Sequence, residues 1–467
     1  MNSFPHAIFR AYDIRGKVNL LTPEVVRAIA HALSCLYKKT NHHTVVIGYD
    51  ARMTSPMYAA IIEDVCQSAG LQTQMIGCCS SPMLYFMARS HGGNGIMVTA
   101  SHNPKTDNGI KWLVNGEPPT PEMIQLIAEE AENSLTAHHH GAHHEIRHQR
   151  VDCFCEQYQQ ALAQDIHLKQ TFKVVLDGMH GSAGHCAAEV FKALGCEVID
   201  LRCDANGDFP DHAPDPSQHK HLKLLKDHIK QHQADIGVAL DGDGDRLVVV
   251  DENGTVITAD QLLSLFAEMT LKAHPQHEIV LDVKCSKAVL DVIEQAQGQS
   301  TMIRTGSSFL RRYLAQSNGR AVFGGEYAGH YVFNDGRGFG YDDGLYAALR
   351  ILEYLDELQT TVSGLMRRYP ARCSTEDLYI STHDFNALDV LAHIKQQSLN
   401  LIAKMTEIDG IRLDFQDGFG IIRASNTGEY LTLRFDADTS VRLNQIQQIF
   451  ISMLAPYPNI ARDLAQA

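Results

Sequence analysis

Short apolar runs recur along the chain in the same order three times. The first run of each block ends in an acid: T-V-V-I-G-Y-D at Asp50, F-K-V-V-L-D at Asp177 and E-I-V-L-D at Asp282. A helix-like stretch and a second apolar run, at 71–77, 196–201 and 300–306, follow in each block. Short apolar runs bounded by turn residues are typical of buried strands. The pattern therefore predicts an internal repeat of alternating strands and helices.

A third strand in each block runs into a loop rich in polar side chains. These loops are T-A-S-H-N-P around Ser101, D-G-D-G-D-R from Asp241 and G-E-Y-A-G-H around Glu326. Turn dipeptides follow them, at Asn115-Gly116, Asn253-Gly254 and Asp335-Gly336, and predict hairpin returns. Because ligands of open α/β sheets bind at the carboxyl ends of strands, we expect the three loops to face one cleft.

The predicted fold is therefore α/β, with three similar mixed-sheet α/β domains and a smaller C-terminal α+β domain around a central cleft. The expected domains are 1–147, 148–253, 254–368 and 369–467. The first boundary falls in a polar, histidine-rich connector. The last domain departs from the repeat and carries the loop R-A-S-N-T-G-E-Y between two strands.

Composition excludes several classes of partner. The 467 residues are 20% charged and 44% hydrophobic, as expected of a soluble globular protein, and the net charge of -15 argues against nucleic acid. No apolar run is long enough to cross a bilayer, so no membrane partner is expected. Charged residues near the start, such as Arg10 and Asp13, leave no apolar core for a secretory signal. The 11 cysteines lack the paired spacing of zinc sites, which fits reduced thiols in a cytoplasm.

The stretch Gly95–Pro104 delivers a serine to the end of a predicted strand. The apolar run Ile96–Val98 stops at T-A-S-H-N-P, whose members are turn formers with hydrogen-bonding side chains. Ser101 is therefore a candidate nucleophile. The alternative is a plain strand exit in which Ser101 caps a backbone amide.

The loop D-G-D-G-D-R predicts a site for a hard cation. Asp241, Asp243 and Asp245 alternate with glycines, so a tight backbone can aim three carboxylates at one ion. An EF-hand and a simple acidic turn are the alternatives. Arg246 stands where an EF-hand requires glycine, and strand-like sequence flanks the loop, so Mg²⁺ with room for a phosphate oxygen is favoured.

Two further loops and a lysine are candidates for binding an anionic sugar. Glu326 and His330 lie between glycines on a turn suited to sugar hydroxyls, or simply to a surface loop. The last loop combines one guanidinium with neutral donors, the set that a phosphate dianion takes: Arg423, Ser425, Asn426 and Thr427. Lys111 could reach back toward Ser101 as an acid or base, or be a solvated strand residue. The histidines at 138–144 could bind a transition metal or form a solvated loop.

Five motifs in this order and spacing resemble the α-D-phosphohexomutases, and most of all their bacterial phosphomannomutase/phosphoglucomutase group. They are F-R-A-Y-D-I-R-G, T-A-S-H-N-P, D-G-D-G-D-R, G-E-x-x-G-H and R-A-S-N-T, and they span all four predicted domains. The resemblance implies an enzyme that interconverts hexose 6-phosphate and hexose 1-phosphate, of mannose or glucose. The intermediate would be a hexose 1,6-bisphosphate, and glucose 1,6-bisphosphate would be the activator.

The resemblance also assigns roles to residues. Ser101 would be a phosphoserine, and it would hold one Mg²⁺ per chain together with Asp241, Asp243 and Asp245. Arg15, Lys111 and Arg246 match catalytic positions. The matched substrate-binding positions are Tyr12, Lys284, Glu326, His330, Arg423, Ser425, Asn426 and Thr427. The expected partners are small-molecule hexose phosphates, and the expected state is a monomer or weak homodimer.

Several positions depart from the family pattern. Tyr327 and Ala328 replace a methionine and a serine of the sugar loop, and Ser307 stands where a histidine is common. In the last loop, Gly428 and Glu429 replace the usual threonine and proline. These departures leave two alternatives open, a phosphoglucosamine mutase and a phosphosugar-binding paralogue without activity.

Overall fold

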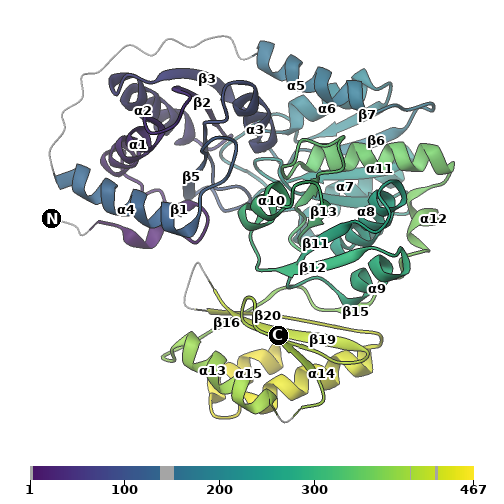
Figure 1. The fold of residues 1–467 in the computed structure, drawn as a ribbon. Coiled ribbons are helices and arrows are strands. Elements are labelled where there is room, and N and C mark those ends of the chain that lie inside the picture. Colours follow the sequence, from purple (N-terminus) through teal and green to yellow (C-terminus); the bar gives the residue numbers. More distant parts are fainter. Residues whose placement is uncertain (1–3, 137–151, 400, 426–429) are drawn as a thin grey trace. The chain divides into compact units, whose positions relative to one another are not determined.

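The computed structural model describes residues 4–136, 152–399, 401–425 and 430–467 (Figure 1). It divides into two compact units. The first unit comprises Met1–Ile257 and Ala328–Arg367, and the second comprises Thr258–Tyr327 and Arg368–Ala467. The histidines at 138–144, and Asn426 and Thr427, lie outside the described residues. Each unit is considered by itself.

The first unit begins with a mixed five-stranded sheet in the order β1-β5-β4-β2-β3. Its strands β2, β3 and β4 are parallel, whereas β5 runs antiparallel to both β4 and β1. The strands are β1 Ile14–Lys17, β2 Thr44–Tyr49, β3 Gln72–Cys78, β4 Gly95–Val98 and β5 Asp107–Leu113. The helices are α1 Pro23–Tyr37, α2 Ser55–Ser68, α3 Ser81–Ser90 and α4 Pro121–Thr136, after the short 3-10 helix η1 His6–Ile8.

A second sheet of the same unit repeats this topology in the order β10-β9-β8-β6-β7. Again three strands are parallel and the next one turns back antiparallel. The strands are β6 Lys173–Asp177, β7 Glu197–Leu201, β8 Ile236–Leu240, β9 Leu247–Asp251 and β10 Val256–Ile257. The helices are α5 Asp152–Asp165, α6 Gly184–Ala193, α7 Lys223–His232 and η2 His219–Leu222. The predicted repeat is confirmed for these two blocks.

The third block lies partly in each unit. In the second unit β11 is central and parallel to both β12 and β13. The elements are β11 Glu278–Asp282, β12 Gln299–Ile303, β13 Ala321–Gly325, α8 Ala259–Ala273, α9 Lys287–Gln295 and α10 Ser307–Gln316. In the first unit the chain continues as β14 Tyr331–Phe333, α11 Gly344–Leu358 and α12 Val362–Met366. The unit boundary thus falls within the predicted sugar loop, between Tyr327 and Ala328.

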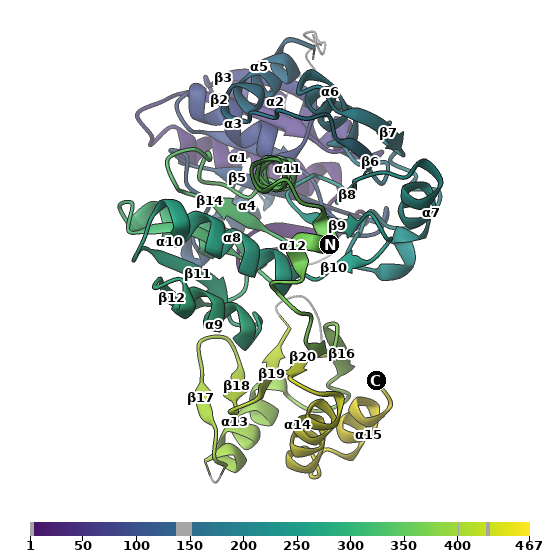
Figure 2. The ribbon, with the colours of Figure 1, turned by 90° about the vertical axis from the view of Figure 1, so that its right-hand side faces the viewer.

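The C-terminal residues form an α+β layer in the second unit, as predicted. Its sheet runs β15-β20-β19-β18-β17, and β16 also pairs with β20 (Figure 2). The strands are β15 Cys373–Ser374, β16 Leu378–Ser381, β17 Lys404–Thr406, β18 Ile411–Asp414, β19 Gly418–Ala424 and β20 Tyr430–Ala437. The helices are α13 Ala387–Ser398, α14 Ser440–Met453 and α15 Pro458–Gln466, and they bury apolar residues of both layers in one core.

The first turn dipeptide, Asn115-Gly116, forms the turn that the sequence predicts. Asn115 and Gly116 both have positive φ, 52° and 83°, and Val114 and Glu117 exchange backbone hydrogen bonds across them. That is the geometry of a type I′ turn, which favours Asn-Gly.

No helix in the described part of the chain is both long and apolar enough to span a membrane.

A buried arginine organises the serine loop of the first sheet. Arg52 is 1% exposed, and its Nε donates to Asp50 Oδ2 at 2.9 Å. Its Nη2 donates to the carbonyl oxygens of Ser101 at 2.6 Å and Asn103 at 2.7 Å. Its Nη1 donates to the carbonyl oxygens of Pro104 at 2.7 Å and Asp107 at 3.1 Å. One guanidinium therefore donates to four carbonyl oxygens of the serine loop and the start of β5.

Replacing this arginine is expected to destabilise the first sheet and its loop. Arg52→Ala removes the cation paired with buried Asp50 and one donor from each of four carbonyls, a loss of about 3–5 kcal/mol for a broken buried pair. The single tryptophan, Trp112, is buried in the same sheet, so its fluorescence during urea unfolding reports the change.

The matched control is Arg27→Ala, which breaks a partly exposed pair with Asp64 at 3.1 Å. Such pairs contribute about 0–1 kcal/mol. Equal losses in the two variants would contradict the role assigned to Arg52.

Candidate active site

Ser101 lies just beyond the end of β4 in a conformation that aims its hydroxyl at an acidic loop. Its φ is +51°, in the left-handed region that non-glycine residues rarely adopt, and it is 2% exposed. The Thr99 hydroxyl accepts the Ser101 backbone N–H at 2.8 Å. The Ser101 hydroxyl donates to Asp241 Oδ2 at 2.6 Å. The serine predicted from the sequence is therefore in direct contact with the predicted metal loop.

The loop after β8 gathers three carboxylates. Asp241, Asp243 and Asp245 are all buried, and one carboxylate oxygen from each lies within 4.8 Å of the others. The glycines between them are required by contact and by conformation: a Cβ on Gly242 would lie 2.4 Å from the Ser101 carbonyl oxygen, and Gly244 has φ +75°. The alternation of Asp and Gly therefore allows the serine loop to approach the acids.

Lys111 is the cation that the structure places against these acids. It lies on β5, and its Nζ donates to Asp243 Oδ2 and to Asp245 Oδ2, each at 2.7 Å. Burial by itself would lower the pKa of Lys111, but the two carboxylates outweigh it and raise the pKa well above its usual value. The side chain is therefore protonated in this state.

The acidic loop carries more negative charge than Lys111 balances. Burial, together with Asp245 and Asp243, raises the pKa of Asp241 well above its usual value. Burial also opposes ionisation of Asp245, yet Lys111 and His330 bring its pKa well below the usual range. Asp243 Oδ1 is buried and accepts no hydrogen bond from the described residues. An all-oxygen donor set with a free buried oxygen and excess negative charge fits a hard divalent cation.

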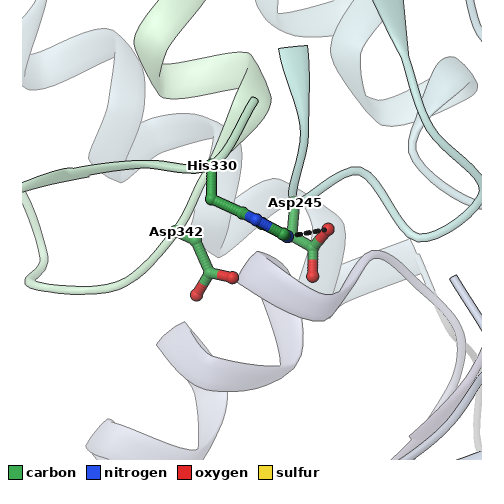
Figure 3. A group of neighbouring side chains, drawn as sticks. All are labelled: Asp245, His330 and Asp342. Atoms are coloured by element: carbon green, nitrogen blue, oxygen red, sulfur yellow. Dashed lines mark ion pairs between the residues drawn. The ribbon is translucent and has the colours of Figure 1, made fainter. Parts of the chain in front are cut away.

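His330 lies beside Asp245 of the same loop (Figure 3). His330 Nε2 lies 3.4 Å from Asp245 Oδ1 and accepts a hydrogen bond from Arg246 Nε at 3.2 Å. Asp245, His330 and Asp342 also offer metal-ligating atoms within 4.8 Å of one another. The Arg246 guanidinium beside the imidazole opposes a second cation there and favours an anionic or hydroxylic ligand.

Arg15 reaches the serine loop from β1. Its Nη2 pairs with Asp13 at 2.6 Å, and its Nη1 donates to Asn103 Oδ1 at 3.3 Å. Close pairing of β1 with β5 positions it, since a Cβ on Gly109 would lie 2.4 Å from the Ile14 carbonyl oxygen. Tyr12 lies half-buried just before β1.

Sequence reasoning missed two residues of this group. His102 Nδ1 lies 3.3 Å from the Ser101 hydroxyl. Burial, with Arg246 and Arg15 nearby, lowers the pKa of His102 well below its usual value, so the imidazole is neutral. Asp342 precedes the cap of α11, where Asp343 accepts the Tyr346 N–H at 2.9 Å. The sequence signal for Asp342 is the acid pair in D-D-G before a helix. One acid is enough to cap the helix, so the second acid calls for another role.

The remaining predicted site residues that the structure describes lie in the second unit. Lys284 Nζ donates to Asp377 Oδ2 at 2.6 Å, and Glu326 Oε1 accepts the Gly306 N–H at 2.5 Å. Arg423, at the end of β19, pairs through Nη2 with Asp409 Oδ2 at 2.8 Å. Ser425 follows and donates its backbone N–H to the Tyr430 carbonyl oxygen at 3.0 Å.

The unusual Tyr327 is explained by packing. Its ring lies under the buried Arg434 guanidinium, 3.5 Å from the guanidinium carbon to the ring centroid. Its hydroxyl donates to the Thr375 carbonyl oxygen at 3.4 Å. A cation–π contact of this kind requires an aromatic face, which a methionine lacks.

The chain matches known proteins along most of its length. Four family models match, described as phosphoglucomutase/phosphomannomutase alpha/beta/alpha domain I at residues 6–138, domain II at 154–254, domain III at 258–373 and C-terminal domain at 384–452. A phosphomannomutase/phosphoglucomutase of Pseudomonas putida is 36% identical over 97% of this chain and 96% of its own. A phosphoglucomutase of Neisseria meningitidis is 34% identical over 98% and 99%.

The solved structures agree in fold. A phosphoglucomutase/phosphomannomutase family protein of Burkholderia thailandensis superposes with a TM-score of 0.88, 32% identity, and coverage of 98% of this chain and 99% of the other. This match confirms the predicted architecture of three mixed-sheet α/β domains and a C-terminal domain. The chain therefore belongs to the phosphoglucomutase/phosphomannomutase family, and it is an intramolecular phosphotransferase of the isomerase class.

Proposed function

We propose that this enzyme interconverts the 6-phosphate and 1-phosphate of mannose or glucose through phosphorylated Ser101 and a hexose 1,6-bisphosphate. The observation that carries the proposal is the 2.6 Å contact between the Ser101 hydroxyl and Asp241, inside a buried group of three carboxylates. The stretch T-A-S-H-N around Ser101 lacks the G-x-S-x-G elbow of acyl-transfer serines, which argues against that role. A phosphoryl group on that oxygen would meet both a cation site and Lys111.

Asp241, Asp243 and Asp245 would hold one Mg²⁺ together with the phosphate on Ser101. The metal would neutralise charge on the phosphoryl group during transfer. Glucose 1,6-bisphosphate would act as activator by phosphorylating Ser101 before the first cycle. The donor set supports this assignment, since oxygen ligands alone suit Mg²⁺ rather than a softer metal.

In the first half of the cycle the bond between phosphorus and Ser101 Oγ breaks, and a bond to the substrate hydroxyl forms. Lys111 Nζ carries a proton because Asp243 and Asp245 raise its pKa, so Lys111 would protonate the departing Oγ and then take up the proton that the substrate hydroxyl releases. Arg246 and Arg15 would offset the charge of the phosphoryl oxygens. The second half returns the other phosphate of the bisphosphate to Ser101 and completes the isomerisation.

The remaining assignments concern substrate recognition. Tyr12, Lys284, Glu326 and His330 would contact the sugar or its phosphate, and Arg423, Ser425, Asn426 and Thr427 would form the phosphate-binding loop. We propose that the four domains 1–147, 148–253, 254–368 and 369–467 each contribute one loop. Hexose phosphates, a monomer or weak homodimer, and a cytoplasmic location complete the proposal, without nucleic acid or membrane partners.

A phosphoglucosamine mutase is the second candidate. Solved N-acetylphosphoglucosamine mutases of Aspergillus fumigatus share this fold at 15% identity and a TM-score of 0.61, which bears on the fold alone. Steady-state rates with mannose, glucose and glucosamine phosphates, compared as kcat/KM, decide between the sugars. Turnover of none of them with Mg²⁺ and glucose 1,6-bisphosphate present would favour a paralogue without activity.

Ser101→Ala removes the oxygen that would carry the phosphoryl group. We expect kcat to fall by about 10³-fold or more, since loss of a covalent nucleophile removes the main reaction route. The measurement is a coupled assay of glucose 1-phosphate conversion with saturating activator. Ser90→Ala, at the exposed end of α3, should retain the parent rate. Activity of Ser101→Ala near that of Ser90→Ala would contradict the proposal.

Loss of one acid from the metal loop should raise the metal requirement. In Asp243→Asn one carboxylate ligand becomes an amide, so the Mg²⁺ concentration for half-maximal activity should rise at least about tenfold. The assay titrates Mg²⁺ into enzyme stripped with a chelator.

The matched control for this change is Asp227→Asn, on the exposed face of α7, where the carboxylate only pairs weakly with Lys223 at 3.7 Å. It should titrate as the parent does. Full activity of stripped parent enzyme without added metal is the outcome that contradicts a metal-dependent site.

A further inference from the structure

Both cations that the proposed function assigns to phosphate binding in the second unit are already paired with carboxylates. Lys284 is 5% exposed and contacts Asp377, which is 19% exposed, at 2.6 Å. Arg423 is 9% exposed and contacts Asp409, which is 11% exposed, at 2.8 Å. Burial by itself would lower the pKa of Lys284, but Asp377 and Asp282 outweigh it and raise the pKa above its usual value. Each of the two cations is thus held by a carboxylate in this state.

The β17–β18 hairpin fixes Asp409 beside Arg423. Ile411 on β18 pairs with Ile422 on β19, so the turn before Ile411 lies next to the end of β19 (Figure 2). Gly410 has φ +89°, and a Cβ there would lie 2.3 Å from the Ile422 carbonyl oxygen. Only glycine allows so close an approach, and it brings the preceding carboxylate to the arginine.

Asp409 also accepts a backbone donor of the kind that binds phosphate. Its Oδ2 accepts the Thr305 N–H at 3.1 Å, two residues before the first turn of α10. A guanidinium and a backbone N–H leading into a helix are the donors that proteins offer to phosphate groups. The Asp409 carboxylate therefore occupies donors suited to a dianion.

We propose that Asp377 and Asp409 are resident anions that a sugar phosphate must displace from Lys284 and Arg423. This inference rests on the proposed function, because it takes the phosphate of a hexose phosphate as the displacing group. The carboxylates keep two buried cations paired between substrates and lower the affinity for the phosphate by competition. The position of β17 at the edge of the sheet leaves the hairpin tip able to withdraw.

If Asp409 merely oriented Arg423, its replacement would weaken phosphate binding, whereas displacement of Asp409 by the phosphate predicts tighter binding. Asp409→Asn and Asp377→Asn should each bind glucose 1-phosphate more tightly, with a Kd about tenfold lower, the size expected for removing one negative charge beside a partly screened phosphate. Binding is measured by calorimetry on dephosphorylated enzyme without activator, so that no turnover occurs. Inorganic phosphate, titrated separately, should show the same direction.

The matched control is Glu407→Gln in the same turn. Glu407 pairs with Lys395 at 2.7 Å and is 45% exposed, so this variant changes the hairpin charge equally without touching Arg423. Thermal unfolding identifies any variant that fails to fold. If one of the two Asn variants fails, the binding affinity of the other tests the inference. A folded Asn variant that binds glucose 1-phosphate no tighter than Glu407→Gln overturns the inference alone. Parent enzyme that binds neither glucose 1-phosphate nor mannose 1-phosphate overturns the proposed function as well.

Discussion

Three buried carboxylates, with one oxygen of each within 4.8 Å of the others, are the constraint on which the candidate active site of the first unit depends. Like charges at that distance in a dry environment repel by several kcal/mol unless cations are brought to them. Lys111 supplies one positive charge by two 2.7 Å contacts, and Arg246 donates its backbone N–H to Asp241 Oδ1 at 3.2 Å. The remaining charge is what a divalent cation and a phosphoserine would resolve together.

The scaffold makes this arrangement possible by bringing two repeated strand ends into contact. The loops after the third parallel strands, β4 and β8, meet where Gly242 lies too close to the Ser101 carbonyl oxygen for a side chain. Arg52 donates to the Ser101 carbonyl oxygen in the loop after β4, and Gly242 and Gly244 allow the tight loop after β8. The duplicated α/β block therefore sets Ser101, the proposed nucleophile, opposite the three carboxylates.

Much of this organisation could be predicted from the sequence because its signals are local. Strand periods, Asn-Gly turns and the alternation of Asp with Gly lie within a few residues, and the physics that produces them acts over the same range. Ser101, Lys111 and the three aspartates were predicted on those grounds. The contact between Ser101 and Asp241, 140 residues apart, is expected from the repeat of the blocks and from the shared Mg²⁺ that the family resemblance implies.

The residues that sequence reasoning missed are single side chains whose partners are distant. Arg52 bonds carbonyls about 50 residues ahead, His102 owes its neutral state to Arg246 and Arg15, and Asp409 meets Thr305 across 104 residues. No short pattern distinguishes them from surface polar residues. Tyr327 was noticed as a departure, but its reason, the Arg434 guanidinium above its ring, is a tertiary contact that only the fold supplies.

The central claim is that Ser101 carries the phosphoryl group that the substrate receives. Its most direct test is a single turnover of enzyme labelled with radioactive phosphate on Ser101, mixed with unlabelled glucose 6-phosphate or mannose 6-phosphate. If Ser101 carries the phosphoryl group, the label should leave the protein and appear in hexose bisphosphate and monophosphate. Label that stays on the protein, or that appears only as inorganic phosphate, would contradict it.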